Sequence, residues 1–125
     1  MKKIVIADDE PHVLRVLKLS LEREGYHVEA FPNAAKALVR IEQEQPDILI
    51  TDISMPVMSG EELCRHIQQE MPDRKFLIFV LTSRTEVEHR EWSRAIDNLS
   101  FLEKPVSIRN LINNLHEYFA ASTAQ

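Results

Sequence analysis

The stretch Lys3-Ile4-Val5-Ile6-Ala7-Asp8-Asp9-Glu10 (KIVIADDE) joins an apolar run directly to three acidic residues. A short run that is apolar at successive positions is typical of a parallel strand covered on both faces. The pattern returns twice, because residues 47–52 are DILITD and residues 76–83 are FLIFVLTS. Buried strands that end in polar residues therefore predict an α/β fold with its chemistry at the carboxyl edge of a parallel sheet.

Five strands are predicted along the chain, with stretches of helical period between them. The strands cover Lys3–Ala7, His27–Phe31, Asp47–Thr51, Phe76–Leu81 and Leu99–Leu102. The second strand alternates between polar and apolar residues and the fifth is brief, so both are predicted to lie at the edges of the sheet. Strands and helices in this order predict a doubly wound, five-stranded parallel sheet with right-handed crossovers and five covering helices.

Capping residues indicate where the first three helices begin or end. Pro11 suits the first turn of the first helix, and Gly25 suits the position just after its end. Asn33 is the predicted N-cap of the second helix, and Ser59 with Glu62 forms a capping-box pattern at the start of the third.

The last two predicted helices differ in their apolar faces. The fifth follows Ser107 and carries a regular stripe that consists of Ile108, Leu111, Ile112, Leu115 and Phe119. The fourth, Thr85–Ile96, sets few apolar residues among many charged ones. We expect this fourth helix to be lightly anchored and mobile.

Length and composition limit the classes of protein. The 125 residues suit one domain, so residues 1–125 are interpreted as a single unit. A net charge of −5 argues against direct binding of nucleic acid, which needs a basic surface. The single cysteine, Cys64, has no disulfide partner, and the apolar run after Met1 is too short for a signal peptide or a membrane span. We therefore expect a cytoplasmic protein that does not associate with membranes.

Acidic residues converge on the predicted carboxyl edge, where Asp8 and Asp9 follow the first strand and Asp52 follows the third. If these strands are neighbours, two carboxylates about 4 Å apart repel each other by roughly 4 kcal/mol at an effective dielectric constant of about 20. A cation would offset that repulsion, and an all-oxygen ligand set with room for water suits Mg²⁺. Acidic residues at loop ends usually lie on the solvated surface and have no further role. Here, however, Thr82 and Lys104 are predicted to lie at the same edge of the sheet as the three aspartates, which favours a functional site.

Taken together and in order, four short motifs make the chain resemble the receiver domain of response regulators, including its chemotaxis-regulator-like members. The motifs are Asp8-Asp9, residues 52–60 (DISMPVMSG), Leu81-Thr82-Ser83 and residues 101–105 (FLEKP). The resemblance covers the whole chain and implies a flavodoxin-like receiver fold with strand order 2-1-3-4-5. It further implies a phosphoprotein of a two-component or phosphorelay system, which carries the phosphoryl group as an aspartyl phosphate.

The resemblance also assigns a role to each residue of the site. It implies that Asp52 is the phosphoacceptor and that Thr82 and Lys104 hold the phosphoryl oxygens. It implies that Asp9, Asp52 and the backbone carbonyl of Ser54 bind Mg²⁺, with Asp8 acting through water. Two further features are implied at the fifth strand: Phe101 is the aromatic residue whose rotamer follows Thr82, and the Lys104–Pro105 bond is cis.

By the same resemblance, the phosphoryl donor is a sensor histidine kinase or a histidine phosphotransfer protein. Phosphorylation would change the face formed by the fourth helix, the fifth strand and the fifth helix. That face would bind a downstream protein or an output domain absent from this chain, and the protein would be a monomer or a weak dimer through it. It would not be an enzyme, but a phosphoacceptor that assists its own Mg²⁺-dependent phosphorylation and dephosphorylation.

Three alternative functions remain to be compared with a phosphorylated receiver. A haloacid-dehalogenase-like phosphatase would need a second aspartate where Ser54 stands, and a flavin-binding protein would need a glycine-rich loop after the first strand. The third is a degenerate receiver that acts as a phosphorylation-independent interaction module.

The chain departs from the family pattern at Ser83 and at Asp97-Asn98. These departures concern the face formed by the fourth helix, the fifth strand and the fifth helix. Ser54 and Arg84 are predicted to tune dephosphorylation.

Overall fold

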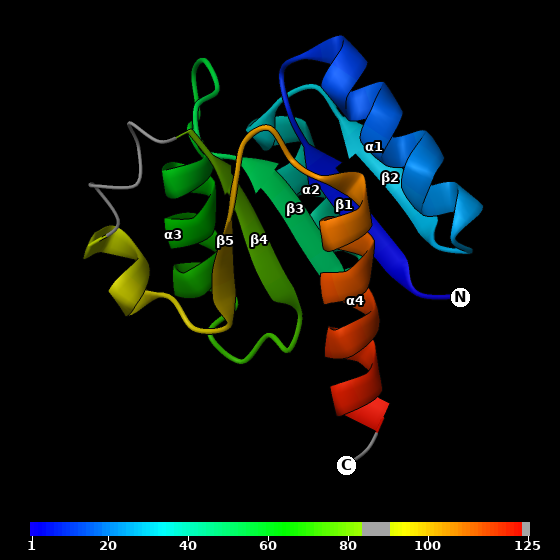
Figure 1. The fold of residues 1–125 in the computed structure, drawn as a ribbon. Helices are drawn as coiled ribbons and strands as arrows, with labels where there is room; N and C mark the ends of the chain where they lie inside the picture. Colours follow the sequence, from blue (N-terminus) through cyan, green and yellow to red (C-terminus); the bar gives the residue numbers. More distant parts are fainter. Residues whose placement is uncertain (84–90, 124–125) are drawn as a thin grey trace.

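A computed structural model describes residues 1–83 and 91–123 and contains one five-stranded parallel sheet (Figure 1). The strand order is β2-β1-β3-β4-β5, which confirms the predicted fold class and order. The strands cover β1 Lys3–Ala7, β2 His27–Phe31, β3 Ile48–Asp52, β4 Leu77–Thr82 and β5 Leu99–Glu103. The two predicted edge strands, β2 and β5, lie at the edges.

Strands β3, β4 and β5 each extend one residue further toward the carboxyl edge than the sequence predicted. Asp52 pairs in register with Leu81, and Thr82 pairs with Glu103. Backbone bonds continue past these pairs, because the Lys104 N–H donates to the Thr82 carbonyl at 2.7 Å. Asp52 and Thr82 are therefore held by the sheet ladder rather than by flexible loops.

Four α-helices cover the sheet in the described part of the chain: α1 Pro11–Arg23, α2 Ala34–Gln43, α3 Gly60–Glu70 and α4 Ile108–Thr123. The predicted capping residues are confirmed. Gly25 has a φ of +95° just after α1, and the Asn33 side chain accepts the Lys36 N–H at 2.9 Å. Ser59 and Glu62 form the capping box of α3.

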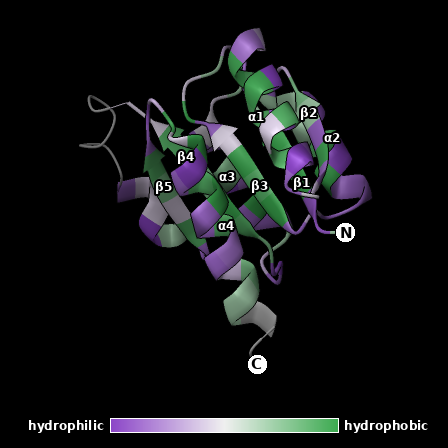
Figure 2. Ribbon diagram, turned by 45° about the vertical axis from the view of Figure 1, so that its right-hand side comes forward, coloured by the Kyte–Doolittle hydropathy of each residue, from purple (hydrophilic) through white to green (hydrophobic). Residues whose placement is uncertain are grey.

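The core consists of two layers of apolar side chains, one on each face of the sheet. In Figure 2 the central strand β3 is coloured largely as hydrophobic. On one face, here called the α2/α3 face, residues of these two helices pack against Val5, Leu49 and Val80. On the other, the α1/α4 face, residues of α1 and α4 pack against Ile6 and Ile50. Burial on both faces explains why the central strands are apolar at successive positions.

The prediction of a fifth α-helix over Thr85–Ile96 needs correction. Residues 84–90 lie outside the described part of the chain, and Glu91–Ala95 forms a 3-10 helix, η2. Its i to i+3 pattern is seen where the Ile96 N–H donates to the Ser93 carbonyl at 3.0 Å. Within Glu91–Ala95 only Trp92 is buried, so this part of the predicted helix has a single apolar anchor instead of a continuous apolar stripe.

The loop between β3 and α3 holds Val57 in the left-handed region, with a φ of +71° and a fully exposed side chain. We expect Val57→Gly to raise the free energy of unfolding by about 0.5–1 kcal/mol. Relief of left-handed strain, about 1–2 kcal/mol, exceeds the entropy cost of glycine, about 0.5–1 kcal/mol. Urea denaturation measures the change.

Val39 provides the matched control, because it is an exposed valine within the helix α2. Val39→Gly should lower the free energy of unfolding by a few tenths of a kcal/mol, since glycine is the poorer helix former. A Val57→Gly variant that is destabilised like Val39→Gly would contradict the strain argument.

Candidate functional site

The carboxyl edge of the sheet gathers the polar residues that the sequence analysis singled out. Asp8 follows β1, Asp52 ends β3, Thr82 ends β4, and Lys104 follows β5. The parallel register places these strand ends side by side in the order β1, β3, β4 and β5. The Lys104–Pro105 peptide bond is cis, as the resemblance implied.

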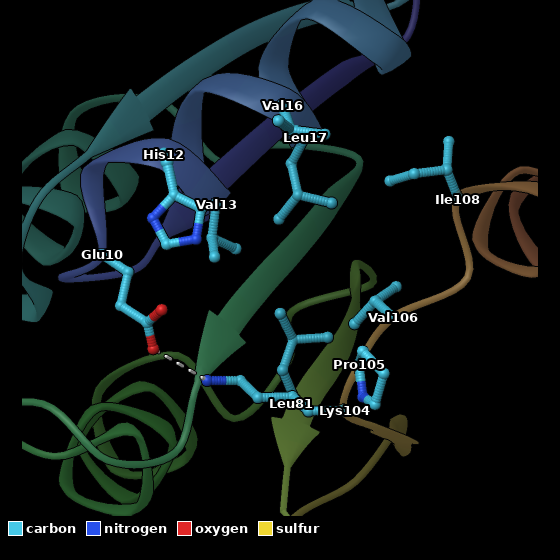
Figure 3. Close-up of a pocket in the computed structure, with 10 residues that line it drawn as sticks. All are labelled: Glu10, His12, Val13, Val16, Leu17, Leu81, Lys104, Pro105, Val106 and Ile108. Carbon is cyan, nitrogen blue, oxygen red and sulfur yellow. Dashed lines mark ion pairs between the residues drawn. The ribbon is translucent and has the colours of Figure 1, made fainter.

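The shortest charged contact at this edge joins Lys104 to Asp52. The Lys104 Nζ lies 2.8 Å from Oδ1 of Asp52 and 3.9 Å from a carboxylate oxygen of Glu10, the pair marked in Figure 3. Burial lowers the pKa of Lys104, but its hydrogen bond and attraction to Asp52 outweigh burial and raise that pKa above its ordinary value. Lys104 is therefore a charged ammonium that neutralises part of the acidic site.

An apolar groove of about 450 Å³ begins beside this ion pair and runs between the first turns of α1 and the start of α4 (Figure 3). Its polar end is formed by Glu10, His12 and Lys104, whereas Val13, Leu81 and other apolar side chains line the remainder. The charged site therefore opens on one side onto an apolar surface.

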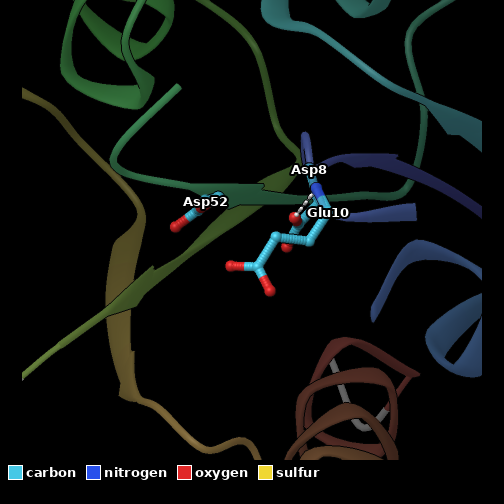
Figure 4. A group of neighbouring side chains, drawn as sticks. All are labelled: Asp8, Glu10 and Asp52. Carbon is cyan, nitrogen blue, oxygen red and sulfur yellow. Dashed lines mark hydrogen bonds between the residues drawn. The ribbon is translucent and has the colours of Figure 1, made fainter. Parts of the chain in front are cut away.

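Three carboxylates form a compact group at the edge: an oxygen from each of Asp8, Glu10 and Asp52 lies within 4.8 Å of the other two (Figure 4). Asp8 is fully buried and Asp52 nearly so, whereas Glu10 is exposed. The Glu10 N–H donates to Asp8 Oδ1 at 2.8 Å. Asp8 Oδ2 is buried and has no hydrogen-bond partner among the described residues.

The pKa values of the two buried carboxyl groups reflect this crowding. Burial raises the pKa of Asp8, and the charges of Asp52 and Glu10 raise it further, against the hydrogen bond from Glu10 and the charge of Lys104. Burial likewise raises the pKa of Asp52, although Lys104 and a backbone hydrogen bond from Ser54 oppose the shift. The negative charge at this edge thus exceeds what Lys104 alone compensates.

These residues suit a hard divalent cation. The ligands on offer are carboxylate oxygens, one of them buried without a partner, and the exposed Glu10 carboxylate borders solvent that can supply water ligands. Mg²⁺ prefers such oxygen ligands and retains several of its waters. The acidic group is therefore a candidate Mg²⁺ site, which agrees with the sequence-based expectation at the level of the metal.

The compact carboxylate group shares Asp8 and Asp52 with the ligand set that the resemblance implied, but the two sets are not identical. Asp9 is exposed and lies outside the compact group, although its charge contributes to the raised pKa of Asp52. Glu10 lies in the group, although its place in the sequence marks it only as part of the acidic run. The tight turn after β1, closed by the Glu10 N–H bond to Asp8, brings Glu10 over the site, and residue spacing alone does not reveal such a turn.

Thr82 and Phe101 are two further residues that the resemblance singled out. Thr82 is fully buried, and its Oγ1 has no hydrogen-bond partner in the described part of the chain. Phe101 is partly buried on the α2/α3 face. The prediction for Arg84 falls outside the described residues, whereas Ser54 is exposed beside Asp52.

Gly60 is a structural requirement of the site, although the sequence shows it only as part of a motif. A Cβ atom at Gly60 would collide with the carbonyl oxygen of Asp52 and lie 2.8 Å from Cα of Ile53. The Gly60 N–H donates to the Ile53 carbonyl at 2.8 Å. The start of α3 therefore packs directly on the backbone that carries Asp52, which only glycine permits.

Comparison with known proteins gives a consistent result. The family model described as "Response regulator receiver domain" matches residues 4–116. The response regulator receiver protein CpdR of Brucella abortus is 37% identical over 122 residues, which are 98% of this chain and 100% of CpdR. The regulatory protein PhoB of Rhizobium meliloti is 32% identical over 90% of this chain, and the chain spans about half (49%) of PhoB.

One of the similar solved structures is a complex that contains Mg²⁺. The response regulator TrrA of Thermotoga maritima, solved in complex with Mg²⁺-BeF, is 30% identical, with a TM-score of 0.81 over 94% of this chain and 98% of TrrA. In the described part of the present chain, no helix has the length and apolar character needed to cross a membrane.

We expect Asp8→Asn to raise the free energy of unfolding at pH 7 without divalent cations by about 1 kcal/mol, because it removes a buried charge that Asp52 repels. Mg²⁺ should stabilise the unsubstituted protein by binding only the folded state, and should stabilise the variant less. Urea denaturation with a chelator and with Mg²⁺ measures both effects. The exposed Asp73→Asn should change neither value by more than about 0.5 kcal/mol.

The advantage of Asp8→Asn should depend on pH in a defined direction. The folded-state pKa of Asp8 is raised, so its protonated form favours folding at low pH and this contribution is lost as the pH rises through the folded pKa. The stability difference between variant and unsubstituted protein should therefore shrink as the pH falls from 7 toward 4. A difference that grows on acidification would contradict the raised pKa.

Proposed function

Because the chain belongs to the response regulator receiver domain family, we propose that it is a phosphorylation-dependent switch that accepts a phosphoryl group on Asp52. The observation that carries the proposal is the position of Asp52. Its buried carboxylate ends a central strand, bonds to the Lys104 ammonium at 2.8 Å and borders the acidic group of Asp8 and Glu10. A nucleophile with a cation beside it is what phosphoryl transfer to a carboxylate requires.

In the proposed reaction, a carboxylate oxygen of Asp52 attacks the phosphorus of a phosphohistidine. The P–N bond breaks, and the imidazole of the donor leaves with its electron pair and takes up a proton. Lys104 would move its hydrogen bond from Asp52 to a phosphoryl oxygen, and the Thr82 hydroxyl would donate to another. Charge neutralisation and positioning supply most of the catalysis in such transfers.

Asp8, Asp9, Asp52 and the backbone carbonyl of Ser54 are the proposed ligands of Mg²⁺, with Glu10 as a further carboxylate at the same site. When bound, Mg²⁺ would neutralise the negative charge that the phosphoryl group brings to this edge. The acidic group of Asp8, Glu10 and Asp52 and the Mg²⁺ complex of the related TrrA support the choice of metal.

The proposed output is a rearrangement of Thr82 and Phe101 that changes the surface around β5 and α4. The proposed donor is a sensor histidine kinase or a histidine phosphotransfer protein, and the proposed recipient is a downstream protein or an output domain. We propose a cytoplasmic monomer or weak dimer that binds no nucleic acid. The domain would catalyse only its own phosphorylation and dephosphorylation.

The proposal is tested by incubating the protein with acetyl phosphate, with and without Mg²⁺, and measuring the intact mass. We expect the mass of one phosphoryl group to be added only with Mg²⁺, because the acidic edge otherwise repels the donor. Asp52→Asn keeps the size of the side chain, removes the nucleophile and should gain no mass. Failure of the folded protein to gain mass would favour the alternative, a degenerate receiver that acts as an interaction module.

A further inference from the structure

Trp92 is the one buried residue of η2 and the only tryptophan of the chain. Its indole, 9% exposed, packs in an edge-to-face arrangement on the ring of Phe101, with centroids 5.8 Å apart and planes inclined by 78°. Edge-to-face aromatic pairs have a defined preferred geometry, so a turn of one ring disturbs the other. Figure 1 shows η2 beside β5 and α3, on the α2/α3 face.

The sheet places Thr82 on the same face as this aromatic pair. Ile78 and Val80 of β4 contribute to the core of the α2/α3 face, and side chains alternate along a strand, so Thr82 also points to that face. Val80 pairs with Phe101 in register, and Thr82 pairs with Glu103 two residues further along. Thr82, Phe101 and Trp92 therefore follow one another on a single face of the sheet.

The chain that follows η2 is fixed in place. Arg74, itself buried, donates to the Asp97 carbonyl and, at 2.8 Å, to Gln68 Oε1, while Gln68 Oε1 also accepts the Asp97 N–H at 3.2 Å. The Asn98 side chain donates to the Lys75 carbonyl at 3.1 Å. Because Asp97 and Asn98 are tied to α3 and to the start of β4, a displacement at Phe101 would tilt η2 about this end.

We infer that Trp92 is a positioning residue of the switch: its indole holds the Phe101 ring in its present orientation and carries a rearrangement at Phe101 to Glu91–Ala95. This inference rests on the proposed function. The Trp92–Phe101 pair stabilises the conformation described here, in which the Lys104 ammonium contacts Asp52, and the proposed phosphorylation breaks that contact. By reciprocity, loss of the pair shifts the equilibrium toward the phosphorylated state.

The first measurement is the fluorescence of Trp92 during titration with beryllium fluoride and Mg²⁺, a non-covalent mimic of the phosphoryl group. Binding is followed independently by titration calorimetry. We expect the fluorescence emission of Trp92 to change on binding. The Phe101→Leu variant should still bind the mimic, but its Trp92 emission should change little or not at all. An unchanged emission in the unsubstituted protein, or an equal change in Phe101→Leu, would overturn the inference.

The second measurement is the affinity for the same mimic. Trp92→Leu should bind it about fivefold more tightly, the lower end of typical coupling between sites, whereas Trp92→Phe should retain most of the original affinity. Leu21→Ala, a buried change on the α1/α4 face, controls for a general loss of stability and should leave the affinity unchanged. Circular dichroism verifies that each variant is folded at the temperature of the titration.

The outcomes separate this inference from the function on which it rests. Absence of mimic binding together with absence of phosphorylation at Asp52 would overturn both. Normal binding with an unchanged or weaker affinity in Trp92→Leu would overturn only the role of Trp92.

Discussion

Two buried carboxylates, those of Asp8 and Asp52, share one edge of the sheet with an ammonium group that bonds to only one of them. Burial disfavours their charged forms, and each lies close to further acidic residues. Neutral side chains at these positions would lower the free energy of the folded state relative to the charged ones. Proteins therefore keep such a buried, charged arrangement where it serves a function. The rest of the structure serves to keep these groups together despite their repulsion.

The backbone supplies that constraint. Asp52 is the last residue of β3 and pairs with β4, so the ladder restricts its position on one side. On the other side, α3 starts against the same backbone through Gly60, where a side chain would not fit. The site is thus built from strand ends and a helix start, and its groups cannot relax far apart without breaking buried hydrogen bonds.

The two faces of the sheet place different groups next to this site. On the α1/α4 face, the groove beside Glu10 and Lys104 offers an apolar surface next to the charged groups. On the α2/α3 face, Thr82 is followed by Phe101 and then by Trp92, which belongs to a short 3-10 helix rather than to a long α-helix. A short element with a single buried anchor is easier to displace than the helices α2 and α3, which each bury at least four residues.

The sequence by itself determined the class of fold, the sheet edge that carries the chemistry, and the helix caps at Gly25, Asn33 and Ser59. These features depend on local patterns: apolar runs, polar strand ends and capping residues are encoded within a few positions. Only the tertiary structure decided that Glu10 joins Asp8 and Asp52, that Gly60 packs on the Asp52 backbone, and that Trp92 meets Phe101. It also decided that Glu91–Ala95 is a 3-10 helix. Each of these depends on contacts between distant segments or on the geometry of one turn, which residue spacing does not specify.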